Sequence, residues 1–197
     1  MRTENKTFNA DMIMRAFPRK VSDDVATVAR CIPQEVYTIP FGGNKFLCRY
    51  KLLDAEEILF PDRVYGVDDL EAPAFFTLTQ KMIFHAFLSR SNNGFVRERH
   101  IRAILIENYP EWIFPYIVKL ADEYVIEILE VIYLYLKSQD CSNIQNFCKL
   151  NLPSFMRSYS RMVSYWNEYY RRPFSEYVGR KLFTECFGYQ NAYKRKT

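Results

Sequence analysis

The chain has 197 residues, of which 49% are hydrophobic and 25% charged, a composition that indicates a folded globular protein and excludes an intrinsically disordered one. Its formal net charge of +4 is too small to demand a polyanionic partner. The five cysteines are widely spaced and form no CxxC pair, which argues against a structural zinc site or a thioredoxin-type motif. We expect all five to be reduced.

The polar N-terminus is not followed by the apolar segment of a secretory signal. The most apolar stretch, 124–136, is interrupted by Glu127 and Glu130 and is shorter than the roughly 20 residues that a bilayer-spanning helix needs. We therefore expect a cytoplasmic protein that does not contact membranes.

The N-terminal third contains two helical patterns and one hairpin pattern. Residues 8–17 and 22–32 have apolar side chains at helical spacing, and each segment is followed by a proline. Residues 35–41 and 45–52 flank Gly42-Gly43-Asn44, and apolar residues alternate with polar ones in the second arm. Period-two spacing beside a Gly-Gly turn predicts a β-hairpin.

The next segment is acidic. A carboxylate at Asp54 and another three residues later at Glu57 predict a short helix that ends before Pro61. Residues 62–76 are interpreted as a connecting loop. Residues 54–76 hold seven carboxylates against one arginine, whereas residues 149–197 hold ten Lys or Arg against three Glu. Solvated faces are the default interpretation of both regions.

A helical body is predicted to start near Thr77, where Thr77-Leu78-Thr79-Gln80 matches a capping box. A second helix is expected from about 95 to 107. The apolar segment 116–136 is interpreted as a central buried helix with a kink or break near Asp122. Three more helices are expected at about 142–149, 154–171 and 175–187, the last stopped by Gly188.

The predicted fold is therefore mainly α, with helical hairpins stacked in a HEAT-like array or an irregular bundle and a small N-terminal β-hairpin. Residues 1–76 are expected to pack on the helical body, 77–197, in one globular unit.

Two resemblances accompany these patterns. Val96-Arg97, opening a helix after a polar turn, resembles the second helix of a HEAT-type hairpin, in which the arginine joins a polar ladder; the resemblance covers one hairpin. Gly94–Arg99, Trp112–Glu130 and Ser164–Arg171 together resemble a group of small uncharacterised bacterial proteins, over roughly 78–172. That resemblance implies a bacterial cytoplasmic setting and no activity.

Glu123, Glu127 and Glu130 stand at i, i+4 and i+7 of the expected central helix. Because an unpaired buried carboxylate is costly, we expect them to form an ion-pair network with Arg97 and Arg99, with Glu127 partly buried. The alternative is a metal-dependent or other enzyme centred on these glutamates and His100. No cofactor or metal is expected, because neither histidine fits a Glu-x-x-His pattern and no cysteine-histidine signature is present.

Arginines interleave with aromatic residues near the C-terminus, and the candidate binding surface consists of Arg157, Arg161, Trp166, Arg171 and Arg172. Arginine beside aromatic rings is the chemistry of single-stranded nucleic-acid binding, although it also fits a core helix with arginines on its solvated side. The leading prediction is a non-enzymatic protein-interaction module with a protein partner. RNA or DNA binding through this region is the second hypothesis.

Overall fold

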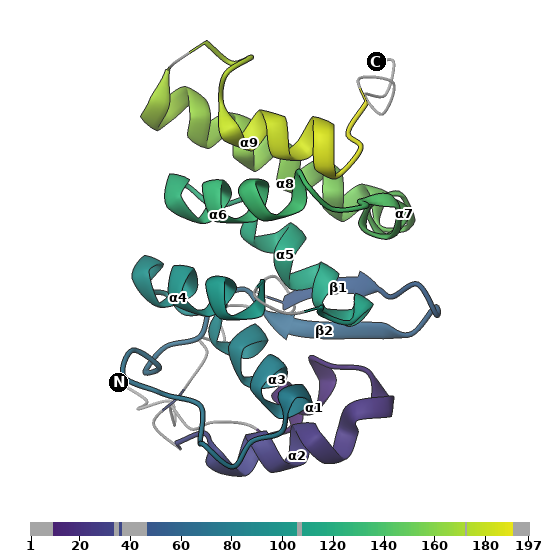
Figure 1. Cartoon of the computed structure of the whole chain (residues 1–197), viewed down its shortest axis with the longest axis vertical. Coiled ribbons are helices and arrows are strands. Elements are labelled where there is room, and N and C mark those ends of the chain that lie inside the picture. Colours follow the sequence, from purple (N-terminus) through teal and green to yellow (C-terminus); the bar gives the residue numbers. More distant parts are fainter. Residues whose placement is uncertain (1–9, 34–35, 37–46, 106–107, 172, 191–197) are drawn as a thin grey trace, which may run out of the picture. The chain divides into compact units, whose positions relative to one another are not determined.

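The structure is a computed structural model that describes residues 10–33, 36, 47–105, 108–171 and 173–190. It is mainly helical, with 61% helix and a small antiparallel sheet near the N-terminus, which confirms the predicted fold class (Figure 1). The chain divides into two compact units. Unit 1 comprises residues 1–50 and 56–107, and unit 2 comprises residues 51–55 and 108–197. No helix among the described residues is long and apolar enough to cross a bilayer.

Unit 1 contains four helices: α1 (Ala10–Arg15), α2 (Ser22–Cys31), α3 (Leu78–Leu88) and α4 (Gly94–Ile104). Each lies within or close to a segment with predicted helical spacing. In the packing, α2 contacts both α1 and α3, and α3 forms a helical hairpin with α4. The apolar faces of these helices supply most of the core of unit 1, which includes Ile13, Val28, Ile83, Phe87 and Ile101.

The two strands are β1 (Leu47–Lys51) and β2 (Glu57–Pro61). The prediction of a strand in the second hairpin arm is confirmed, but the helix predicted from Asp54 to Pro61 is wrong. The buried Ile58 and Phe60 alternate with the more exposed Glu57 and Leu59, so period-two burial prevails over the local capping pattern. The predicted first arm falls on residues 35 and 37–41, which lie outside the described residues, apart from Val36.

The acidic segment packs within unit 1. Val64 pairs with the turn between α3 and α4: its amide donates to the Arg90 carbonyl at 2.7 Å, and its carbonyl accepts from Asn92 at 2.9 Å. Arg99 of α4 donates to the carbonyls of Asp68 and Leu70 at 2.9 and 3.4 Å. Hydrogen bonds from the backbone and an arginine side chain of the α3–α4 hairpin therefore fix this segment, which the sequence analysis interpreted as a connecting loop.

The capping box at the start of α3 is present as predicted. The Thr77 hydroxyl accepts from the Gln80 amide at 3.2 Å, and the Gln80 side chain accepts from the Thr77 amide at 3.1 Å. The Gln80 side chain also donates to Asp24 of α2 at 2.9 Å. The cap thus fixes the start of α3 and its contact with α2.

Replacing Thr77 with alanine is expected to lower the free energy of unfolding by about 1 kcal/mol, because one backbone donor of the first turn loses its partner. Thr77→Ser keeps the hydroxyl and is the matched control. Urea unfolding measures both variants. Equal urea midpoints for Thr77→Ala and Thr77→Ser would show that the Thr77 cap does not contribute to the free energy of unfolding.

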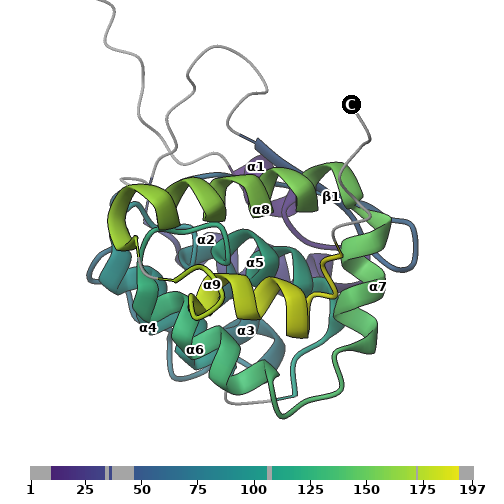
Figure 2. The same ribbon diagram turned by 90° about the horizontal axis from the view of Figure 1, so that it is seen from above.

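Unit 2 is built from α5 (Phe114–Leu120), α6 (Ile126–Leu136), α7 (Ser142–Leu150), α8 (Leu152–Tyr165) and α9 (Val178–Lys181). Figure 2 shows α8 and α9 running side by side, with α7 crossing at the start of α8. The predicted break near Asp122 is confirmed, because α5 and α6 are separate helices. Glu123 consequently lies in their connection and does not share a helix face with Glu127 and Glu130.

Two of the C-terminal helices end in a wider turn. After Tyr165, α8 continues as a π-helical turn, Trp166–Tyr170, which ends at Arg171 with a positive φ of 47°. After Lys181, α9 continues as a second π-helical turn, Leu182–Cys186, and Gly188 follows with a φ of 69°. The predicted stop at Gly188 is confirmed, because glycine adopts this backbone conformation without steric cost.

Aromatic rings fill the space between α8 and the residues that follow α9. Phe155 stacks on Phe183 with ring centroids 5.4 Å apart, and Tyr159 stacks on Tyr189 at 3.6 Å. A Cβ atom at Gly179 would lie 2.6 Å from the Tyr177 ring, so glycine is needed where α9 approaches its neighbours. Much of the chain's large aromatic content therefore serves the core.

Candidate binding surface

Three tyrosines from two segments of unit 2 meet at its surface. Tyr124 lies in the α5–α6 connection, Tyr165 ends α8, and Tyr169 lies in the π-helical turn that follows. Their ring centroids are 5.9 to 6.2 Å apart in all three pairs. Tyr124 is 46% exposed and Tyr169 is 61% exposed, whereas Tyr165 is half-buried. These rings present contiguous aromatic area to solvent.

A backbone contact holds the two segments together. The Tyr170 hydroxyl donates to the carbonyl of Tyr124. Tyr170 also stacks on the buried Tyr177, with ring centroids 5.4 Å apart. The π-helical turn is thereby fixed against the α5–α6 connection, which places Tyr169 beside Tyr124.

Arg161, one turn before Tyr165 on α8, completes the cluster. Its guanidinium donates to the Tyr165 hydroxyl at 3.2 Å and lies 5.9 Å from that ring's centroid. Its Nε is also 3.8 Å from a carboxylate oxygen of Asp122, which is 2% exposed. We call Tyr124, Arg161, Tyr165 and Tyr169 the tyrosine–arginine surface.

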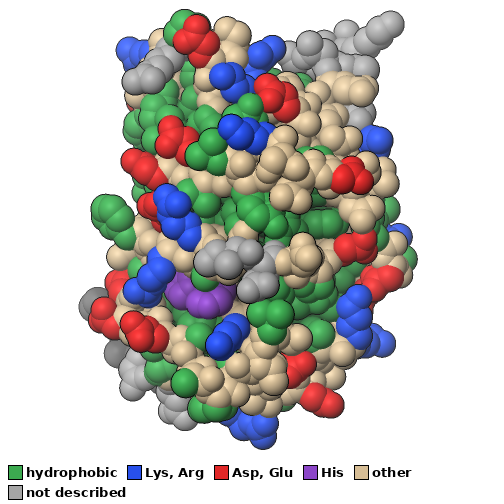
Figure 3. All heavy atoms as spheres, viewed as in Figure 1, with side chains coloured by type: hydrophobic (Ala, Val, Ile, Leu, Met, Phe, Trp, Pro, Cys, Tyr) green, Lys and Arg blue, Asp and Glu red, His purple; other side chains and the backbone are tan. Residues whose placement is uncertain are grey.

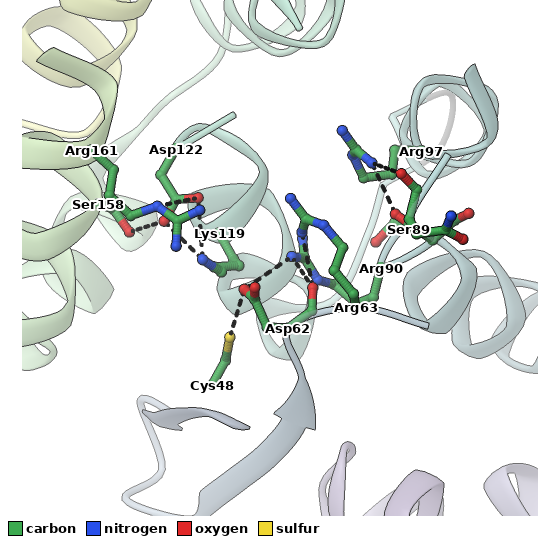
Figure 4. Close-up of polar contacts among 12 residues, drawn as sticks. Cys48, Asp62, Arg63, Ser89, Arg90, Arg97, Lys119, Asp122, Ser158 and Arg161 are labelled. Atoms are coloured by element: carbon green, nitrogen blue, oxygen red, sulfur yellow. Dashed lines mark hydrogen bonds and ion pairs between the residues drawn. The ribbon is translucent and has the colours of Figure 1, made fainter. Parts of the chain in front are cut away.

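Asp122 is the centre of a buried polar network beneath this surface. Its carboxylate accepts from the Lys119 ammonium at 2.9 and 3.2 Å and from the Ser158 hydroxyl at 3.0 Å (Figure 4). Lys119 and Ser158 are themselves buried. The network joins α5, the connection that follows it, and α8, which are the elements that carry the tyrosine–arginine surface.

The other residues of the predicted binding surface are arranged differently. Arg157 is exposed and donates to the Ser154 hydroxyl at 2.8 Å, and Arg171 is exposed and donates to the Asn167 carbonyl at 3.2 Å. Trp166 is half-buried and packs on Phe174, with ring centroids 4.7 Å apart. Arg172 lies outside the described residues. Among the four of these residues that the structure describes, Arg161 contacts the tyrosine cluster, through the half-buried Tyr165.

Exposed carboxylates stand close in sequence to two of the tyrosines. Glu127 and Glu130 are exposed on α6, and Glu168 is exposed in the π-helical turn between Tyr165 and Tyr169. Burial raises the pKa of Tyr170, and the negative charges of Glu127 and Glu130 act in the same direction. The expectation that Glu127 is partly buried is wrong, because α6 is amphipathic rather than apolar on all sides and Glu127 lies on its solvated side.

The predicted ion-pair network spans both units. Arg97 is buried in unit 1, where it donates to the carbonyls of Ser91 and Asn92 at 2.9 and 3.0 Å, and Arg99 is exposed on α4. Glu123, which is buried, and the exposed Glu127 and Glu130 belong to unit 2. The pairing of these arginines with the glutamates stays a prediction.

The enzyme hypothesis relied on His100 together with the three glutamates. His100 lies in unit 1 and contacts His85. In the part of the chain that the structure describes, no three His, Cys, Asp or Glu side chains gather as a metal-binding group. Burial raises the pKa of Cys148 and raises that of Cys186 to about 12, so both remain protonated near neutral pH, the reverse of what a cysteine nucleophile requires.

Tyr124, Tyr165 and Tyr169 are not among the five residues predicted for the binding surface. Tyr124 belongs to an apolar stretch interpreted as helix interior, and nothing local distinguishes it from the buried residues around it. The interleaving of Arg161 with Tyr165 and Tyr169 is the signal that indicated the rest of the surface.

No protein-family model matches the chain, and no curated protein or solved structure is significantly similar to it, so its function is inferred from the arrangement of its own residues.

Proposed function

We propose that the protein is a non-enzymatic interaction module that binds a protein partner through the tyrosine–arginine surface of unit 2. The observation that carries this proposal is the pair of exposed rings, Tyr124 and Tyr169, which pack on each other and on Tyr165, the ring that Arg161 contacts. Tyrosine and arginine are enriched among the residues that dominate binding energy in protein interfaces.

Preorganisation supports the same role. Ordering side chains on binding costs affinity, and this cost is smaller when the rings already contact one another. The tyrosines touch in all three pairs, and Arg161 lies between the Tyr165 ring and the buried Asp122. A partner therefore meets a surface whose geometry exists before binding.

The surrounding charge favours a protein over a nucleic acid. Single-stranded nucleic acids bind in basic grooves that follow the phosphate backbone. Here the exposed Glu168 stands next to Tyr169 in the chain, and the exposed Glu127 and Glu130 lie on α6, which begins shortly after Tyr124. Carboxylates repel phosphates, whereas a protein partner can meet Arg161 and these glutamates with complementary side chains.

The proposal predicts that Tyr169→Ala weakens partner binding by about 2 kcal/mol or more, roughly thirtyfold, as expected for a central aromatic contact. Leu150→Ala is the matched control, because Leu150 is 43% exposed and lies beside the opposite end of α8. Quantitative affinity purification from the native cell, with wild type and both variants as bait, measures the effect.

A partner that is lost with Tyr169→Ala and retained with Leu150→Ala supports the proposal. A partner retained equally by both variants contradicts it. Loss of the recovered material on nuclease treatment, or a steep decrease of binding with salt, assigns the surface to nucleic acid instead.

A further inference from the structure

The α3–α4 hairpin of unit 1 brings together the chain's only two histidines. Nδ1 of His85 lies 2.8 Å from Nδ1 of His100, and the ring centroids are 5.1 Å apart. His100 is 2% exposed and His85 is half-buried, and the Phe84 ring packs edge-on against both. In Figure 3 histidine side-chain atoms are visible at the surface, with Lys and Arg as well as Asp and Glu side chains around them.

The contact depends on the protonation of the two rings. At 2.8 Å the two Nδ1 atoms share one hydrogen, so one ring donates its N–H and the other accepts with a bare nitrogen. When both rings are fully protonated, two N–H groups of like charge face each other and the hydrogen bond is lost.

Charged groups of both signs stand on the elements around the pair. Lys81 of α3 and Arg99 of α4 are the cations that act on the rings. From the elements packed against them, α2 presents Asp24, whose carboxylate binds Gln80, and the acidic segment contributes Asp68, Asp69 and Glu71.

The pKa values follow from these surroundings. Burial is the largest cause that lowers the pKa of His85 to about 4, and the positive charges of Arg99 and Lys81 add to it. Burial, and after it His85 and Arg99, lowers the pKa of His100 to about 3. Both rings are therefore neutral near pH 7 in the closed hairpin.

We infer that the His85–His100 pair is an acid-sensitive latch that holds α4 against α3 near neutral pH and releases it on acidification. In the opened hairpin the imidazoles reach water and regain a pKa near 6.5. The open state then binds protons that the closed state does not bind in this pH range, so acidification shifts the equilibrium toward the open hairpin. The latch is fully effective above about pH 6.5 and weakens as the pH falls from there toward about 4.

The size of the effect follows from the number of protons. When opening takes up two protons, the opening equilibrium rises by up to about a hundredfold between about pH 7.5 and about pH 5.5. Peptides of α3 and α4 are expected to lose amide protection by that factor in hydrogen–deuterium exchange on the full chain, after correction for the intrinsic exchange rate. Peptides of α7 and α8 serve as the internal reference.

The matched variant is His85→Gln with His100→Gln, because two glutamines can hydrogen-bond to each other without titrating. Its α3–α4 protection is expected to be independent of pH over the same range. Equal acid sensitivity in the variant and the wild type would overturn the latch. So would unchanged protection of α3 and α4 in the wild type.

A second measurement on the wild type alone guards against a variant that does not fold. The imidazole nitrogen chemical shifts of the folded protein are expected to show both rings neutral at about pH 5.5. Rings that titrate near pH 6.5 without loss of α3–α4 protection would also refute the latch.

Discussion

Replacing Asp122 with alanine is expected to lower the free energy of unfolding of unit 2 by about 3–5 kcal/mol. The carboxylate is buried and accepts from both Lys119 and Ser158. Its removal leaves the buried Lys119 ammonium without this counter-charge, which costs far more than a surface ion pair contributes. Because Arg161 also approaches Asp122, the variant should weaken partner binding as well.

Further substitutions separate the effect of the Asp122 charge from the effect of its packing. Asp122→Asn keeps the shape and loses the charge, so it should also destabilise unit 2. Combining Asp122→Asn with Lys119→Met removes both charges and is expected to recover most of the lost stability, since a buried pair is often no better than well-packed neutral residues. Urea unfolding followed by tryptophan fluorescence measures the series. A single alanine variant within about 1 kcal/mol of wild type would refute the buried-network account.

The second large effect is expected at Arg90 in unit 1, whose replacement with alanine should cost about 3 kcal/mol or more. The side chain is fully buried, donates to the Asp62 carbonyl at 2.7 Å, and lies 3.7 Å from its carboxylate (Figure 4). Alanine removes these contacts and leaves a cavity at the end of α3. The segment that follows β2 would lose one of its side-chain links to the α3–α4 hairpin and would keep those from Arg99.

Arg90→Met retains most of the volume and loses the charge, so it isolates the polar contacts from the cavity. We expect it to lie between wild type and Arg90→Ala in free energy of unfolding. Thermal unfolding monitored by circular dichroism distinguishes the three proteins. Identical transitions in all three would show that neither the contacts nor the volume of Arg90 stabilises unit 1.

The helices could be predicted because their signals are local. Pro18 and Pro33 stand at helix ends, Thr77 and Gln80 are three residues apart, and Gly188 supplies a positive φ. Each signal needs only neighbouring residues to act. The helix boundaries from α3 onward therefore lie close to the predicted ones.

The strand β2 could not be predicted in the same way. Asp54 and Glu57 match a helix start, and the preference for a strand comes from the pairing with β1 and the burial of Ile58 and Phe60. These are contacts with residues elsewhere in the chain. The free energy gained from strand pairing and burial thus outweighs the local preference for a helix start.

Only part of the candidate site could be predicted from the sequence. Arg161, Tyr165 and Tyr169 follow one another at helical spacing, so their proximity could be predicted. The approach of Tyr124 and of the Lys119–Asp122 pair to α8 depends on how the α5–α6 connection packs, some 40 residues away in sequence. The expectation that the segment is apolar on all sides also misplaced Glu127, because α6 buries Ile128 and Leu129 on one side and exposes that glutamate on the other.

The most direct test of the proposed interaction surface is photo-cross-linking in the native cell, with a photoreactive amino acid at position 169 and, as control, at position 150. The account predicts a discrete protein adduct, resistant to nuclease, from position 169 and its absence from position 150. A nuclease-sensitive adduct at position 169, or the same adducts from both positions, would contradict the claim that the tyrosine–arginine surface binds a protein partner.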